Sequence, residues 1–265
     1  VLPLMYKFER QAVIFDLLQK NKTVSVKELS ALLQVSTETI RRDLTDMEEQ
    51  GLIRRIHGGA VLAETATTEL EHPYNIREVQ QYREKDAICR HAASFIQDGD
   101  LVFIDNSTTT QGLIKHINPN YHVTVVTNSI SHLLEAAKVQ NSNLTMICLG
   151  GIFRAKNFSI VGGLTIELAN RFKPNRAFIS CRSVDLDKGL YDGSLYELET
   201  KKTFMQSSPE VYLLADHTKF QASGPVYVGT INEITTVITD SRVKADTLSE
   251  LESRGIKVSV AQITD

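Results

Sequence analysis

The chain has 265 residues, of which 42% are hydrophobic and 23% charged, and its formal net charge is −3. This composition is ordinary for a soluble globular protein of one or two domains, and no apolar run approaches the roughly 20 residues of a membrane span. The start lacks the regions of a signal peptide, and Cys89, Cys148 and Cys181 lack the spacing of a metal site. We expect a cytoplasmic protein with reduced thiols, no metal and no cofactor.

Residues 23–62 carry the pattern of a winged helix-turn-helix. Apolar side chains recur at a helical period over 26–33 and again over 37–50. Ser36 is placed to cap the second helix, and Gly51 is placed to end it. Strands over 52–56 and 60–62, joined by a glycine turn, are expected to form the wing.

The polar face of the second helix is typical of a helix that binds the major groove of DNA. Hydroxyl side chains reach phosphates or base edges, and guanidinium groups pair with guanine or with phosphate oxygens. The alternative is a solvated helical hairpin in a protein-interaction domain. The residues predicted to contact double-stranded operator DNA are Ser36, Thr37, Thr39, Arg41 and Arg42 from the helix and Arg54, Arg55 and His57 from the wing.

Charge is divided unevenly along the chain. Residues 1–62 hold nine Lys or Arg and eight Asp or Glu, which gives a net charge of +1. Residues 63–265 hold 20 Lys or Arg and 24 Asp or Glu, which gives a net charge of −4. Only the first segment therefore suits a polyanion. We expect a DNA-binding domain over 5–62, a linker over 63–75 and a second domain over 76–265.

From residue 76 onward, helical and strand patterns alternate. This alternation predicts an α/β domain with a mostly parallel sheet. A first helix is expected over 76–97. Strands are expected over 101–105, 123–127, 144–150, 177–180, 211–215 and 236–239, and helices over 110–116, 130–139, 165–172, 195–207 and 244–253.

Polar side chains follow the first three of these strands. In such sheets, ligands bind beyond the carboxyl ends of the strands, where hydroxyl groups and free backbone N–H groups suit a phosphate oxygen. Each loop alone fits an ordinary helix cap, but three loops at one edge favour a small, phosphorylated ligand. The loops contribute Asp105, Ser107, Thr108, Thr109, Thr110, Thr127, Asn128, Ser129, Gly150, Gly151 and Arg154.

Later segments add charged side chains to the expected cleft. Glu197 and Lys201 lie one helical turn apart and fit either the cleft or a solvated surface pair. Asp216 and Lys219 follow an apolar strand, where they would bind sugar hydroxyls and phosphate or transfer protons between adjacent carbons. The spacing does not separate binding from isomerase chemistry.

The segment from residue 9 to residue 62 resembles the helix-turn-helix of the DeoR-type bacterial transcription regulators, above all at 38–44 and 57–60. The remainder looks like that family's sensor domain, which has a ribose-5-phosphate isomerase/CoA transferase-like fold related to the sugar-phosphate deaminases. The resemblance implies a repressor of a sugar-utilisation operon with a phosphorylated sugar as effector. It also implies a homodimer or homotetramer, because two half-sites need at least two copies.

The chain departs from the family pattern over 180–185. Relatives usually have a small, glycine-rich segment there, whereas this chain reads Ser-Cys-Arg-Ser-Val-Asp. We expect Arg182 to bind a further anionic group of the effector, to fill the site and alter or abolish the response, or to point to solvent. Two other functions stay open. One is a sugar-phosphate isomerase or deaminase with a DNA-binding appendage, and the other is a DNA-binding protein whose second domain only oligomerises.

Overall fold

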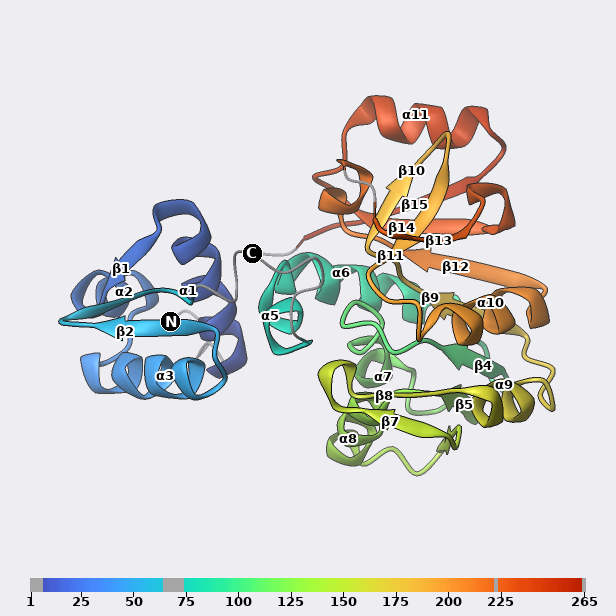
Figure 1. The fold of residues 1–265 in the computed structure, drawn as a ribbon, viewed down its shortest axis with the longest axis horizontal. Helices are drawn as coiled ribbons and strands as arrows, with labels where there is room; N and C mark the ends of the chain where they lie inside the picture. Colours follow the sequence, from blue (N-terminus) through green and yellow to red (C-terminus); the bar gives the residue numbers. More distant parts are fainter. Residues whose placement is uncertain (1–6, 64–73, 222–223, 264–265) are drawn as a thin grey trace. The chain divides into compact units, whose positions relative to one another are not determined.

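The computed structural model describes residues 7–63, 74–221 and 224–263. The chain divides into two compact units, residues 1–83 and 84–265 (Figure 1). Most of the linker predicted over 63–75 lies outside the described residues. None of the described helices is long and apolar enough to cross a membrane.

The N-terminal unit is a winged helix-turn-helix, as predicted. Its helices and strands are α1 (Lys7–Asn21), β1 (Thr23–Ser25), α2 (Val26–Leu33), α3 (Thr37–Glu49), β2 (Ile53–Ile56), β3 (Gly59–Leu62) and α5 (Tyr74–Val79). The strands form an antiparallel sheet in the order β1-β3-β2. Gly51 follows α3 in the left-handed region at φ +71°, which confirms its place at the end of this helix.

The helix α1, which the sequence analysis did not predict, completes the core of this unit. Phe15 and Leu18 of α1 are buried in the same apolar cluster as Ile40 of α3. Arg10 and Asp43 form a bidentate ion pair, with Nε–Oδ2 at 2.7 Å and Nη2–Oδ1 at 3.1 Å. The pair ties α1 to the buried side of α3 and leaves the opposite face of α3 open.

The strand β1 was also not predicted, because three residues show no clear period. Its approach to β3 explains the glycine at position 59. A Cβ at Gly59 would lie 2.0 Å from the carbonyl oxygen of Val24. The wing can pack against β1 only because this residue has no side chain.

The prediction of a single helix over 76–97 is wrong. The structure has two helices there, α5 and α6 (Tyr82–Ala93), and Gln81 between them is left-handed at φ +52°, a conformation that interrupts an α-helix. Ile76 and Val79 of α5 belong to the core of the winged helix. The first unit therefore extends to Arg83 rather than ending before residue 76.

The C-terminal unit is an α/β domain, as predicted. Its main sheet has the order β15-β14-β12-β9-β4-β5-β6, and every neighbouring pair is parallel. The strands are β4 (Leu101–Ile104), β5 (Val123–Thr127), β6 (Leu144–Cys148), β9 (Arg176–Ile179), β12 (Glu210–Leu214), β14 (Thr236–Asp240) and β15 (Lys257–Ala261). Only β15 lies outside the predicted strands.

Two smaller antiparallel sheets were not predicted. One is a hairpin of β7 (Ile152–Arg154) and β8 (Ser159–Val161), and the other joins β10 (Ser183–Asp185), β11 (Gly189–Asp192) and β13 (Val226–Gly229). These strands have only three or four residues, so alternation is too short to show in the sequence. Both sheets matter for the site described below.

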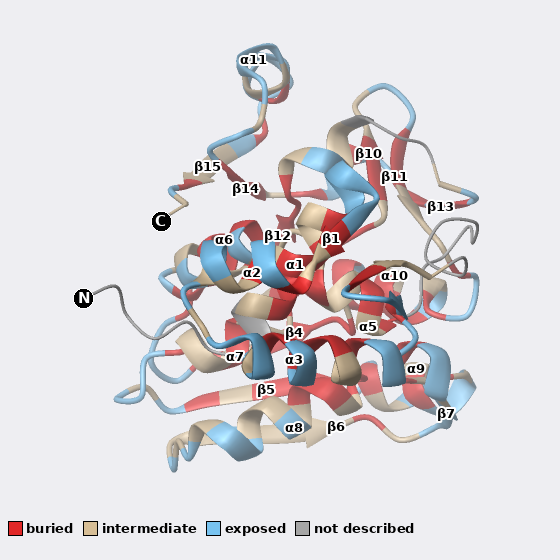
Figure 2. Cartoon of the chain, turned by 90° about the vertical axis from the view of Figure 1, so that its left-hand side faces the viewer, coloured by how far each residue is buried: buried red, intermediate tan, exposed pale blue. Residues whose placement is uncertain are grey.

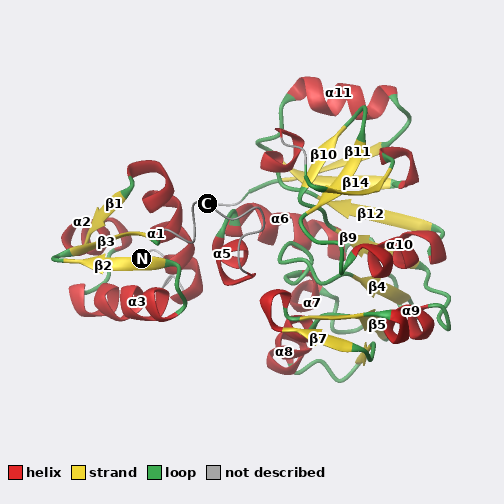
Figure 3. Cartoon of the chain, viewed as in Figure 1, coloured by secondary structure: helices red, strands yellow, loops and turns green. Residues whose placement is uncertain are grey.

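Helices cover both faces of the main sheet, as Figure 3 shows. Side chains of α6 and α7 pack on one face, and those of α9, α10 and α11 pack on the other. The predicted helices after α6 are present with the same or shorter bounds, except that the helix predicted over 165–172 begins and ends earlier, at 163 and 169. They are α7 (Leu113–His116), α8 (Ile130–Val139), α9 (Gly163–Ala169), α10 (Leu198–Ser207) and α11 (Ala245–Ser253), with 3₁₀ turns η1 (Ala155–Asn157), η2 (His217–Gln221) and η3 (Ile231–Glu233).

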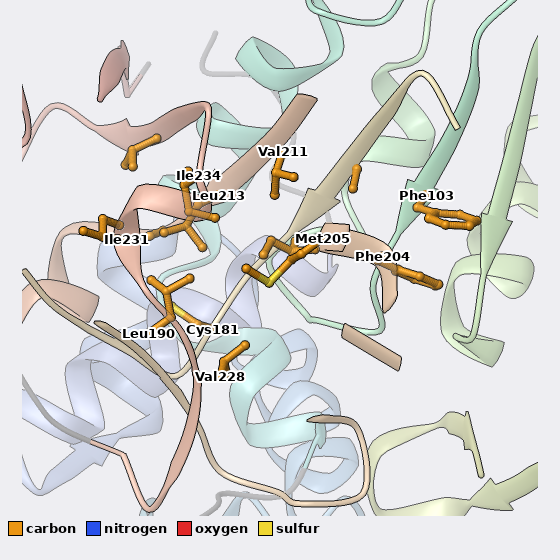
Figure 4. Packing of buried hydrophobic residues seen from close by; sticks show 14 of the residues in the cluster. Phe103, Cys181, Leu190, Phe204, Met205, Val211, Leu213, Val228, Ile231 and Ile234 are labelled. Carbon is orange, nitrogen blue, oxygen red and sulfur yellow. The ribbon is translucent and has the colours of Figure 1, made fainter. Parts of the chain in front are cut away.

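Successive residues of the central strands enter different cores, because side chains alternate along a strand. In β4, Val102 and Ile104 belong to one apolar cluster and Phe103 belongs to the other. Phe103 stacks on Phe204 of α10 with 4.3 Å between ring centroids, and both are labelled in Figure 4. Figure 2 shows the resulting contrast between buried strands and exposed outer helix faces. The ends of these strands are thus held by packing on both sides.

Candidate functional site

The open face of α3 carries the two arginines predicted to contact DNA. The side chains of Arg41 and Arg42 are 58% and 79% exposed, and the opposite side of the helix is buried at Ile40 and Leu44. Each arginine lies near Glu38, at 3.6 and 3.7 Å. Surface ion pairs of this kind are weak, so both guanidinium groups are available to an anionic partner.

The first turn of α3 is held by its own hydroxyl groups. The Ser36 Oγ accepts a hydrogen bond from the Thr39 backbone N at 3.1 Å and lies 2.9 Å from the Thr39 Oγ1. Thr37 beside them is exposed. Ser36 therefore caps the helix, as predicted, and positions the residues that follow.

The two arginines of the wing lie on opposite faces of β2, because side chains alternate along a strand. Arg55 shares a face with the buried Ile53, and its Nη1 donates to the Thr45 Oγ1 of α3 at 2.8 Å. Arg54 is on the other face and, among the described residues, has no hydrogen-bond or ion-pair partner. His57 is exposed at the turn. Arg55 thus braces α3, while Arg54 and His57 project from the wing.

The polar loops of the C-terminal domain meet at the carboxyl edge of the main sheet. β4 lies between β5 and β9, and the order of the strands reverses direction between β4 and β9. Such a switch point is where parallel sheets open a crevice. The Asp105 carboxylate bridges it: Oδ1 accepts from the Ser107 N at 3.2 Å and the Thr110 Oγ1 at 2.9 Å, and Oδ2 accepts from the Ser180 N at 3.0 Å.

Lys201 lies between two carboxylates at this edge. Its Nζ is 3.1 Å from the Asp105 Oδ2 and 2.5 Å from the Asp192 Oδ2, and it donates to the Ser180 carbonyl. Burial alone would lower the pKa of Lys201, but the charges of Asp192 and Asp105 outweigh it and raise that pKa above its ordinary value. The interpretation of Lys201 and Glu197 as a solvated surface pair is wrong, because both side chains are buried.

Glu197 ties the β7–β8 hairpin to the start of α10. Its Oε1 accepts from the Arg154 Nη1 at 2.7 Å, the Asn157 Nδ2 at 3.1 Å and the Ser159 Oγ at 2.8 Å. Burial raises the pKa of Glu197, but hydrogen bonds from Ser194, Ser159 and Asn157 and the charge of Arg154 bring it below its ordinary value. Glu197 is therefore a carboxylate that holds the hairpin in place.

Asp216 follows β12 at the same edge. Its Oδ1 accepts from the Thr218 N at 3.0 Å and from the Thr218 hydroxyl. Burial raises the pKa of Asp216, but the charges of Lys219 and Lys85 and the Thr218 hydrogen bonds lower it overall. Lys85 of α6, which was not predicted, is buried, and its Nζ donates to the Thr108 Oγ1 at 3.2 Å. Two ammonium groups thus lie beside the loops after β4 and β12.

The loops after β5 and β6 are held by hydrogen bonds within the chain. The Ser129 Oγ accepts from the His132 N at 3.4 Å and so caps α8, and the Thr165 Oγ1 donates to the Gly150 carbonyl at 2.8 Å. A Cβ at Gly151 would lie 2.2 Å from the Thr165 Oγ1. The glycine at this position therefore serves the packing of the loop against α9.

The structure brings the predicted effector residues to one edge but with different exposures. Asp105, Thr108, Thr109, Thr110, Thr127, Asn128, Ser129, Glu197, Lys201 and Asp216 are buried, Ser107, Gly150, Arg154, Arg182 and Lys219 are half-buried, and Gly151 is exposed. Within the described part of the chain, no group of three or more His, Cys, Asp or Glu side chains is arranged to hold a metal ion.

Several buried polar atoms at this edge lack a hydrogen-bond partner among the described residues. They are Asn128 Oδ1, His132 Nδ1, Ser180 Oγ, Ser183 Oγ and Glu197 Oε2. Burial also lowers the pKa of His132 to about 3, so its ring is neutral at pH 7. An unpaired buried polar atom is costly, so these atoms indicate a polar ligand or water between the loops.

Arg182 immediately precedes β10. Its backbone N donates to the Tyr191 carbonyl at 2.9 Å, and its Cδ would lie 3.5 Å from a Cβ at Gly224. The residue is half-buried, and its side chain has no acidic partner among the described residues. Its charge is therefore not neutralised within the described chain, in contrast to the charges of Arg154 and Lys201.

Two family models match the chain in sequence order. Residues 10–66 match the DeoR-like helix-turn-helix domain, and residues 80–241 match the DeoR C terminal sensor domain. The HTH-type transcriptional regulator GolR of Listeria innocua is 31% identical over 97% of this chain and 100% of its own. The HTH-type transcriptional repressor CsqR of Escherichia coli is 32% identical over 96% and 95%. The glycerol-3-phosphate regulon repressor of Escherichia coli is 28% identical over 97% and 100%.

Solved structures resemble the chain only distantly. A ribose 5-phosphate isomerase A from Methanocaldococcus jannaschii aligns with 51% of this chain and 53% of its own, at 14% identity and a TM-score of 0.37. Because this similarity is low, the description of the fold rests on the strand order given above and not on this structure.

Proposed function

Because this chain belongs to the DeoR family of transcriptional regulators, we propose that it represses a sugar-utilisation operon and that a phosphorylated sugar releases it. The observation that carries the effector half of the proposal is a group of buried polar atoms, unpaired among the described residues, that come mainly from the segments after β5 and β9. One relative is a glycerol-3-phosphate regulon repressor, and its name supports the same class of effector.

The DNA half of the proposal rests on the exposed face of α3. Arg41 and Arg42 exchange their weak pairing with Glu38 for guanine edges or phosphate oxygens in the major groove. Arg54 contacts the phosphate backbone from the wing. Two copies then read half-sites about 34 Å apart, one helical turn of DNA.

The effector half uses the edge of the main sheet. Lys85 supplies positive charge beside the hydroxyl-rich loop after β4, where the phosphate binds, and Lys219 supplies it beside Asp216 after β12. Asn128 Oδ1 and Ser180 Oγ, unpaired among the described residues, take sugar hydroxyls. A 100-fold change in operator affinity needs about 2.7 kcal/mol of coupling, which is within the usual range.

Turnover of a sugar phosphate is not expected. Relatives that match over nearly the whole chain are named regulators and repressors. Asp105 and Lys201 are bound to each other and to neighbouring groups. These two groups therefore hold the loops together, and Asp216, the carboxylate considered for proton transfer, likewise accepts hydrogen bonds from the Thr218 N and hydroxyl.

The first experiment is a thermal-shift measurement with glycerol 3-phosphate, ribose 5-phosphate, glucosamine 6-phosphate and inorganic phosphate. A ligand at 100 times its Kd stabilises the fold by about 2.7 kcal/mol, and the same ligand should release the operator in a gel shift. Lys219→Ala should abolish both effects and keep operator binding, whereas Lys173→Ala, an exposed lysine before β9, should change neither. If no sugar phosphate shifts the wild-type protein, the C-terminal domain serves oligomerisation alone.

We also propose that Arg182 binds a second anionic group on the effector, because its guanidinium has no acidic partner among the described residues. We expect 6-phosphogluconate to bind more tightly than glucose 6-phosphate, and Arg182→Ser to remove that difference. If Arg182→Ser tightens binding of both compounds, the side chain fills the site instead.

A further inference from the structure

Two hydrogen bonds outside the apolar core join the wing strand β2 to α3. The Arg55 backbone N donates to the Glu48 Oε1 at 2.7 Å, and the Arg55 Nη1 donates to the Thr45 Oγ1 at 2.8 Å. Thr45 and Glu48 lie about one turn apart on α3, which lies beside β2 in Figure 1 and contacts it. We call Thr45, Glu48 and Arg55 the wing brace.

The backbone bond of the wing brace follows from the position of β2 in its sheet. β2 is at the edge of the order β1-β3-β2, so alternate N–H groups along it have no partner within the sheet. The N–H of Arg55 is one of these groups, and the Glu48 carboxylate accepts its hydrogen bond. Glu48 therefore holds the outer edge of the wing against α3.

The directions of the hydrogen bonds at Thr45 follow from its neighbours. A guanidinium group can only donate, so the Thr45 Oγ1 accepts from Arg55. The hydroxyl hydrogen of Thr45 then goes to the Arg41 carbonyl at 2.9 Å. Thr45 thus has no hydrogen left for a phosphate oxygen. Instead, it connects the wing to the turn of α3 that carries Arg41, one of the residues predicted to contact DNA.

The apolar core and the wing brace hold different parts of β2. Ile53, at the start of the strand, is buried in the same cluster as Leu44 and Met47 of α3. Arg55 is two residues closer to the turn of the wing and is exposed. Hydrogen bonds rather than apolar burial therefore hold this end of β2 against α3. Loss of the brace should leave the fold intact and release the tip of the wing.

We propose that Thr45 and Glu48 are positioning residues for operator recognition, because through Arg55 they set how the wing lies against α3. The inference rests on the proposed function, since it requires that α3 and the wing bind the same operator. Phosphate contacts carry no sequence information, whereas contacts to base edges depend on where each side chain lies. The wing brace therefore determines the preference for an operator over other DNA and not the affinity for DNA in general.

The test compares binding to two duplexes of about 40 base pairs, a length that holds two half-sites. One is an operator that the wild-type chain selects from a randomised pool, and the other is the same sequence scrambled. Thr45→Val removes the hydroxyl and should weaken binding to the selected operator about tenfold, the order of one lost base contact. Its binding to the scrambled duplex should stay at the wild-type level. Thr45→Ser keeps the hydroxyl and should bind both duplexes as the wild type does.

Glu48→Ala is compared with Glu49→Ala, because Glu49 is the next residue of α3, is exposed and has no hydrogen-bond or ion-pair partner among the described residues. Each variant removes one negative charge, which by itself tightens binding to any duplex. Glu49→Ala should therefore bind the selected operator at least as tightly as the wild type, whereas Glu48→Ala should bind it about tenfold more weakly. Glu48→Gln keeps an acceptor oxygen and should bind it as the wild type does.

Thermal midpoints of all these variants should lie within about 5 °C of the wild type, because a surface hydrogen bond contributes little stability. The proposal is overturned if Thr45→Val and Glu48→Ala bind the selected operator like the wild type. Equal losses on both duplexes would also overturn it, because a lost phosphate contact or a damaged fold weakens both. A wild-type chain that selects no duplex would overturn the DNA half of the proposed function as well. If Thr45→Val does not fold, Glu48→Ala and its control decide the question.

Discussion

In the N-terminal unit the arginines assigned to DNA stand on the surface of α3, and the acid nearest to them, Glu38, is exposed as well. In the C-terminal domain, by contrast, Asp105 and Lys201 are buried and bonded to each other. An exposed pair is easily exchanged for a ligand, whereas a buried pair is part of the fold. Substitutions at the predicted DNA contacts of the first unit should therefore change binding without changing stability. Substitutions at the buried polar edge of the second unit should change both.

The largest effect is expected from Lys201→Met. The substitution leaves Asp105 and Asp192 without the cation between them, and removing one partner of a buried pair costs about 3–5 kcal/mol. Chemical denaturation measures the free energy of unfolding. Lys202→Met at the neighbouring, half-buried position should cost far less. Equal losses for the two variants would contradict the role given to Lys201.

The double variant Arg41→Ala/Arg42→Ala tests whether binding can be lost without a loss of stability. Loss of two base or phosphate contacts should weaken operator binding about 100-fold or more, with no change in thermal midpoint, because both side chains are exposed. A gel shift at fixed salt measures this. Arg171→Ala, which removes an arginine that is 68% exposed in the other unit, is the matched control. Wild-type affinity in the double variant would remove α3 from the DNA interface.

Acid should destabilise the C-terminal domain through His132. Burial lowers the pKa of His132 from 6.5 to about 3, so between these values the unfolded chain binds a proton that the folded chain does not. The free energy of unfolding should therefore fall by about 2 kcal/mol between pH 7 and pH 5. Denaturation at the two pH values measures this loss, and His132→Gln should reduce it. If the free energy of unfolding of His132→Gln falls as much as that of the wild type between pH 7 and pH 5, other groups cause the fall.

The smallest effect is expected in the wing. Arg54→Ala should reduce the slope of log affinity against log salt by about 0.9, the value for one phosphate contact. Arg55→Ala should leave the slope nearly unchanged, because the Arg55 side chain is bonded to Thr45 of α3. Titrations at several salt concentrations compare the two. A larger change for Arg55→Ala would reverse the assignment of these residues.

Local patterns in the sequence predicted α2, α3 and most strands of the main sheet, because apolar periodicity and helix caps depend on near neighbours. Lys85, Asp192 and His132 were missed, because each gains its role from partners brought close by the fold. Lys85 donates to Thr108, 23 residues away. No spacing rule predicts such pairs. The helix break at Gln81 was missed for a related reason, since nothing in this glutamine marks a left-handed residue.

The first turn of α6 contains the boundary between the two units. Glu84, the first residue of the C-terminal unit, pairs with Arg242, and Lys85 donates to Thr108 in the loop proposed to hold the phosphate. The chain that arrives from the N-terminal unit is thus anchored beside the loop proposed to bind the effector. Coupling between two ligands is reciprocal, so if the proposed effector weakens operator binding, the operator must weaken effector binding by the same factor. Under the proposed function, a copy on DNA is then a less sensitive detector than a free copy, and clearing the operator would take more effector than saturating the free protein.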